Sequence, residues 1–258
     1  MDRALVVYSF IWPPERDFKE NVDEDRNPVA YYFEGMRQSM ARLVQLPGMA
    51  VRFRVHMHPA CAALAARLPP FAQQMGTTIE VVYCQATDYW QYPMLARSVT
   101  LLSHPGNEKV VMVDGHDSPT EQADLIDRLT KSMELSQPSK SAGFTFWPTD
   151  GMPWPWEPGQ GREQPLFQVF ASNGPPAVAK PWTVDCGLAI TTPEFRTALG
   201  LDYAAFVREA LDKYANVWFH FNMLSDEALL DAALFRSGPA RAQLVKDASA
   251  IAPHWLEA

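Results

Sequence analysis

A continuous apolar run, Val110 to Val113, ends abruptly in two carboxylates, a histidine and a hydroxyl within residues 114–118. Apolar stretches without alternation are typical of strands that are buried on both faces, as in the parallel sheets of α/β proteins. Such a strand requires helices on both sides of its sheet. Ligands of α/β proteins bind where strands leave the sheet, so residues 114–118 are the first candidates for a binding site.

Strand-like and helix-like patterns alternate along the first 113 residues. We expect strands over residues 3–10, 49–57, 77–84 and 110–113, and helices over residues 28–45, 59–75 and about 94–101. This alternation predicts an α/β fold with a mostly parallel central sheet, right-handed crossovers and flanking helices. The chain has 258 residues, and we expect them to form a single domain.

The second half of the chain continues less regularly. We expect strands over residues 143–147 and 182–191, and helices that start near Pro119, Pro193, Tyr203 and Ser225. Between the two strands, residues 148–181 contain eight prolines, which predicts a long irregular loop. Loops of that length inside a domain are more often functional than incidental.

Composition excludes several classes of protein. The formal net charge of -8 argues against a general phosphate-binding surface, so we expect no nucleic-acid partner. No apolar run approaches the roughly 20 residues that span a bilayer, and no signal-peptide pattern stands at the start, so we expect a soluble cytoplasmic protein. Three widely spaced cysteines without a CxxC pair predict buried thiols rather than disulfides or a structural zinc site.

The residues that follow Val113 suit a hard divalent cation. Asp114 and Asp117 offer carboxylate oxygens, and the phosphates of a substrate could complete the shell. Ser118 is expected to be the N-cap of a helix that begins at Pro119, whose N-terminus favours an anion nearby. Alternatively, Asp117 and Ser118 only cap this helix, and Asp114 is a solvated turn residue.

Three short motifs stand in an order that resembles the nucleotide-sugar-dependent glycosyltransferases of the GT-A fold. DGHDS, residues 114–118, stands where that family has an Asp-x-Asp motif, with one extra residue between the aspartates. VDCGLAITTPEFR, residues 184–196, is similar to the family's small-residue motif, and SDEALLDAAL, residues 225–234, to its acidic helix start. Together the motifs extend the resemblance over residues 3–235.

The resemblance implies a transferase that moves a sugar from a UDP- or GDP-sugar to a carbohydrate or other hydroxyl acceptor, assisted by Mn²⁺ or Mg²⁺. Residues 1–118 would be the nucleotide-binding half and residues 119–258 the acceptor-binding half. A nucleotidyltransferase is an alternative, although residues 10–15 are not the glycine-rich basic loop that it would carry. A second alternative is a catalytically silent binding or structural protein with the same fold.

The resemblance also assigns roles to residues around the strand ends. It implies a metal site of Asp117, Asp114 and His116, and a donor-binding site of Ser9, Phe10, Trp12, Asp88, Arg97, Asp114, Ser118, Asp185, Cys186 and Gly187. Arg97 would bind phosphate or sugar, because a guanidinium forks onto phosphate oxygens; alternatively it lies on a solvated helix face. Gly187 would let the donor sugar approach the backbone, while a tight bend in a buried strand is the alternative.

The acidic helix start would supply the catalytic carboxylate. Asp226 or Glu227 could deprotonate the acceptor hydroxyl, whereas a cap and helix-dipole partner is the simpler alternative. His220 and His254 are lesser candidates, since a C-terminal histidine joins the metal shell in some members of the family. In the proline-rich loop, Trp154 and Trp156 suit stacking on an acceptor sugar, or else an oligomer contact.

Overall fold

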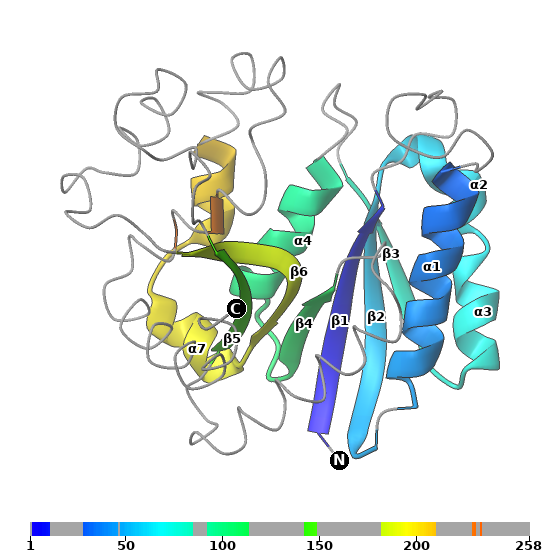
Figure 1. Ribbon diagram of the computed structural model, residues 1–258, viewed down its shortest axis with the longest axis horizontal. Coiled ribbons are helices and arrows are strands. Elements are labelled where there is room, and N and C mark those ends of the chain that lie inside the picture. The colour runs from blue at the N-terminus through cyan, green and yellow to red at the C-terminus, as the bar shows by residue number, and fades with distance from the viewer. Residues whose placement is uncertain are drawn as a thin grey trace.

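The computed structural model of the chain describes residues 2–10, 28–45, 47–84, 92–113, 142–148, 182–209, 229, 230 and 233. These residues form a six-stranded sheet with strand order β3-β2-β1-β4-β6-β5 (Figure 1). The strands are β1 (Asp2–Phe10), β2 (Met49–Met57), β3 (Ile79–Tyr83), β4 (Lys109–Val113), β5 (Ala142–Pro148) and β6 (Trp182–Thr191).

Two kinds of pairing divide the sheet. Strands β1 to β4 run parallel to one another, whereas β6 is antiparallel to both β4 and β5. The predicted α/β class with a mostly parallel sheet and flanking helices is therefore confirmed. The reversed direction of β6 is a finding of the structure, because the pattern of residues 182–191 does not encode the direction of that strand; β5 runs in the same direction as β4.

Helices cover both faces of the parallel strands. The described helices of the chain are α1 (Pro28–Leu43), the 3-10 helix η1 (Pro59–Cys61), α2 (Ala62–Ala65), α3 (Leu68–Gln74), α4 (Tyr92–Ser103) and α7 (Pro193–Leu199), and residues 203–209 are also helical. Ala4, Val6, Tyr8 and Phe10 of β1 share a core with α1, η1 and α2. On the opposite face, α4 packs on β1, β2 and β4 (Figure 1).

The central strands are buried on both faces. Residues 4–8 of β1 are at most 1% exposed, and Val110 to Val113 of β4 at most 2%. The prediction made from the apolar run is thus confirmed. Burial of each large aliphatic side chain contributes about 1.5 to 3 kcal/mol, so these two strands supply much of the stability of the sheet.

The single helix expected over residues 59–75 is wrong. The structure has three short helices there, and the chain turns between α2 and α3. Pro69 and Pro70 explain the break, because proline lacks the N–H that an ongoing helix needs but fits the first turn of a new one. Both lie in that first turn of α3. The predicted end at Gly76 is confirmed by its φ of 70°, where glycine is favoured.

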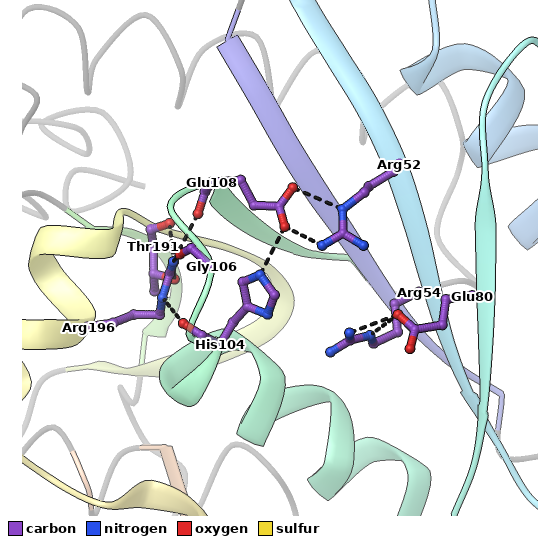
Figure 2. Close-up of polar contacts among 8 residues, drawn as sticks. All are labelled: Arg52, Arg54, Glu80, His104, Gly106, Glu108, Thr191 and Arg196. Atoms are coloured by element: carbon purple, nitrogen blue, oxygen red, sulfur yellow. Dashed lines mark hydrogen bonds and ion pairs between the residues drawn. The ribbon is translucent and has the colours of Figure 1, made fainter.

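A buried arginine joins α7 to the start of β4 (Figure 2). Arg196 is 8% exposed and donates to the main-chain oxygens of His104, Gly106, Glu108 and Thr191 at 2.7 to 3.1 Å. It also donates to the hydroxyl of Thr191. The turn between α4 and β4 is therefore held against the end of β6 by one side chain.

The same turn is tied to β2 through Glu108. Arg52 donates two hydrogen bonds to the Glu108 carboxylate, and His104 Nε2 lies 2.9 Å from Glu108 Oε1 (Figure 2). The hydrogen bonds from Arg52 are the main reason that the pKa of Glu108 is below its usual range. Charged groups at this edge thus fasten the start of β4 to its surroundings.

Replacing Arg196 by methionine should lower the free energy of unfolding by about 3 kcal/mol or more, because several buried carbonyls lose a charged donor. Urea unfolding followed by circular dichroism measures this. The matched control is Arg208→Met, since Arg208 is exposed and its loss should cost no more than about 0.5 kcal/mol. Equal losses of stability in the two variants would contradict the conclusion that Arg196 stabilises the turn between α4 and β4.

Candidate functional site

The sheet has a topological switch point between β1 and β4. From β1 the chain adds β2 and then β3 on one side, and it then returns to place β4 on the other side of β1. The helices α1 and α4 lie on opposite faces at this point. Ligands of such sheets bind at the carboxyl ends of the two strands that flank the switch. These ends are Phe10 of β1 and Val113 of β4.

The small-residue motif lies beside the end of β4. Leu188 of β6 pairs with Val113, and Gly187 directly precedes Leu188 in the chain. The pairing of β6 with β5 jumps here from Ala189 to Asp185, so residues 186–188 have no register partner in β5. The small-residue motif is thus next to the last residue of β4, which directly precedes residues 114–118 in the sequence. The side chains of Asp185 and Cys186 lie outside the described residues.

A buried histidine stands next to Ser9 at this edge. Ser9 is opposite His56 in the β1–β2 register, and His56 is 5% exposed. His56 Nε2 lies 2.9 Å from the hydroxyl oxygen of Thr100, which itself donates to the carbonyl of Ala96. Since that hydroxyl has one proton, His56 is the donor, and its Nε2 carries the hydrogen. Within the part of the chain that the structure describes, His56 Nδ1 has no hydrogen-bond partner.

His56 is neutral at physiological pH. Burial is the main cause that lowers the pKa of His56 to about 3, and the charges of Arg54 and Arg97 add to it. Neither His56 nor Thr100 was among the expected site residues. The only signal in the sequence was one more polar residue in the strand pattern of residues 49–57, where Arg52 and Arg54 already alternate with apolar residues.

Arg97 lies at the end of β4 as a fully buried side chain. It is 0% exposed, and its Nη1 donates to the main-chain oxygen of Val113 at 3.0 Å. The alternative of a solvated helix face is therefore wrong. Its spacing of four residues from the buried Leu101 is the signal that could have placed it on the packed face of α4.

Phe10 is a packing residue in this structure. Its side chain is 2% exposed, and its ring meets that of Phe33 edge to face, with centroids 5.7 Å apart. It therefore joins the end of β1 to α1.

The remaining expected site residues lie outside the described residues. They are Trp12, Asp88, Asp114, His116, Asp117, Ser118, Trp154, Trp156, Asp226 and Glu227. Among the residues that are described, no three His, Cys, Asp or Glu side chains gather into a metal-binding cluster.

The described cysteines match the expected chemistry. Cys61 and Cys84 are both buried free thiols. Burial raises the pKa of Cys61 to about 11 and that of Cys84 to about 12, so both remain protonated and unreactive. In the described part of the chain, no helix has the length and apolar character needed to cross a bilayer.

Comparisons with known proteins give a distant likeness to solved structures. No protein-family model matches the chain, and no curated protein matches it in sequence. Among solved structures, the apo form of mouse xyloside xylosyltransferase 1 resembles it with a TM-score of 0.46 and 11% identity. The likeness covers 93% of this chain and 83% of the other. A likeness at this TM-score establishes neither a shared fold nor a shared activity.

The neutral state of His56 predicts a pH-dependent stability. Because its folded pKa of about 3 is below the usual 6.5, the unfolded chain binds the proton first, and stability is lost as pH falls from about 6.5 toward 3. One such group contributes at most about 1.4 kcal/mol per pH unit. Urea unfolding of wild type and His56→Gln at pH 4 to 7 should show a shallower slope in the variant. Equal slopes would contradict this account.

Proposed function

We propose that the chain is a glycosyltransferase that moves a sugar from a UDP- or GDP-sugar to a hydroxyl group of a carbohydrate or other acceptor. The observation that carries the proposal is the switch point between β1 and β4. Ser9 is at the end of β1, and Asp114 directly follows β4 in the sequence. This is the position at which α/β proteins hold nucleotides and their phosphates.

Mn²⁺ or Mg²⁺ fits the chemistry of the side chains that follow β4. Asp117 and Asp114 would hold the ion through carboxylate oxygens, and His116 would add a nitrogen ligand. When bound, the ion supplies positive charge that neutralises the diphosphate leaving group.

The donor would lie across the strand ends. We infer that residues 9–12 and Asp88 bind the base and ribose, and that Ser118 binds a phosphate at the start of the following helix. The donor sugar would approach the backbone at Cys186 and Gly187, where β6 leaves its pairing with β5. Asp185 would accept hydrogen bonds from sugar hydroxyls.

Residues in the second half of the chain would bind the acceptor. Trp154 and Trp156 would stack on the apolar face of an acceptor sugar. In an inverting reaction, Asp226 or Glu227 would take the proton from the acceptor hydroxyl as that oxygen attacks the anomeric carbon. In a retaining reaction, the same carboxylate would face the anomeric carbon from the opposite side.

Thermal unfolding with UDP, GDP and their sugar derivatives, each with and without Mn²⁺, tests the proposal. A ligand at about a hundred times its Kd adds about 2.7 kcal/mol, which corresponds to a rise in Tm of roughly 5 to 10 °C for a chain of this size. We expect a shift that depends on Mn²⁺ in wild type and is lost in Asp117→Asn. The matched control is Asp202→Asn, since Asp202 caps a helix at the surface and asparagine caps equally well.

Donor hydrolysis with the same panel separates an active enzyme from a silent binding protein. Metal-dependent hydrolysis that Asp226→Asn or Glu227→Gln abolishes, without loss of the thermal shift, is the expected result. If no nucleotide shifts the Tm of wild type, or if Asp117→Asn and Asp202→Asn behave alike, the proposal is wrong.

A further inference from the structure

We propose that Arg97 is a positioning residue: it fixes the point at which β4 ends, and thereby the place of Asp114, without contacting the donor. The link to a metal ion rests on the proposed function, whereas the effect on the end of β4 does not. The contact that the structure gives Arg97 Nη1 is to the main chain, whereas the sequence predicted a contact to phosphate or sugar.

The argument begins with the peptide unit that Arg97 holds. Its Nη1 donates to the oxygen of Val113 at 3.0 Å, and Val113 is the last residue of β4. That oxygen belongs to the planar peptide unit that joins Val113 to Asp114. A bond that orients the oxygen therefore also orients the amide and Cα of Asp114, because the six atoms of the unit move together.

Arg97 reaches this oxygen from the face of the sheet that α4 covers. It lowers the pKa of His56 on β2 and donates to Val113 on β4, and β1 lies between these strands. Ser9 is on the same face, since the alternate residues Tyr8 and Phe10 pack in the core on the α1 side. The guanidinium thus lies on the α4 face of the sheet, near the ends of β1 and β4.

Burial makes this contact specific. Arg97 is the largest side chain that is fully buried among the described residues. A guanidinium stays charged in proteins, and burial of that charge is unfavourable unless hydrogen bonds satisfy it. The neutral state of His56 leaves no second positive charge at that neighbour. The hydrogen bond from Nη1 to Val113 therefore offsets part of the cost of burying this charge.

Arg196 offers a matched comparison at the other end of the same strand. It is also buried, and it donates to the main-chain oxygen of Glu108, directly before β4 begins (Figure 2). Both arginines stabilise β4 through carbonyl groups. Only Arg97 is at the end that leads into Asp114, so equal substitutions at the two sites separate a general loss of stability from a local effect.

The experiment compares Arg97→Met and Arg97→Lys with Arg196→Met and Arg196→Lys in the full chain. Lysine keeps a cation and a donor, so the lysine variants remain informative if a methionine variant does not fold. The first measurement is amide hydrogen exchange without ligand, read in peptides that span residues 110–116 and 104–109. The second is a Mn²⁺ titration in which free Mn²⁺ is counted by electron paramagnetic resonance.

We expect exchange in residues 110–116 to be at least about tenfold faster in Arg97→Met than in wild type, with a smaller change in Arg97→Lys. In Arg196→Met the larger change should fall in residues 104–109. Mn²⁺ affinity should fall by about tenfold to a hundredfold in Arg97→Met and change little in Arg196→Met. Loss of a nearby cation removes Coulomb repulsion and would by itself strengthen Mn²⁺ binding, so the direction of the change in affinity distinguishes positioning from charge.

Unchanged exchange in residues 110–116 in both Arg97 variants would overturn the inference, whatever wild type does with Mn²⁺. The same holds if Arg97→Met and Arg196→Met give the same exchange pattern, because Arg97 would then have a general structural role. A third measurement is the thermal shift of Arg97→Met with UDP and Mn²⁺. Weakened UDP binding there, with unchanged or stronger Mn²⁺ binding, would identify a direct phosphate contact and also overturn the inference. Failure of the proposed function is seen separately, as wild-type protein that shows no Mn²⁺-dependent shift with any nucleotide.

Discussion

The position of β4 is the constraint on which the rest of the structure depends. This strand joins the parallel half of the sheet to its antiparallel half, since it pairs with β1 on one side and β6 on the other. Its last four residues are almost completely buried. An apolar strand of this kind has little side-chain pattern to define its register, because both faces are equally apolar. The hydrogen bonds of Arg196 and Arg97 at its two ends therefore help to fix the position of β4.

Both arginines bind main-chain oxygens rather than acting only through carboxylates. A guanidinium has five N–H groups in a rigid fork, so one side chain can donate to several carbonyl groups. Arg196 does this for the turn before β4, and Arg97 contacts the carbonyl at its end. Hydrogen bonds from buried, charged side chains therefore hold the backbone at the two ends of this apolar strand.

Local patterns predicted most elements of the described chain. The expected bounds of β2 and β6 agree with the structure residue for residue, because turn-forming residues flank them and their interiors are rich in β-branched and aromatic side chains. The helix predicted over residues 59–75 failed where Pro69 and Pro70 start a new helix. There a local rule on proline was available, and the apolar periodicity concealed it.

The sequence by itself determined the alternation of strands and helices, the burial of residues 110–113 and the acidic residues that follow them. These depend on side-chain polarity and spacing, which are local properties. Only the tertiary structure decided that β4 lies beside β1, that Cys186 and Gly187 meet its end, and that Arg97 is buried beneath it. Strand order, direction and register arise from contacts between segments far apart in the chain, and no local spacing encodes them.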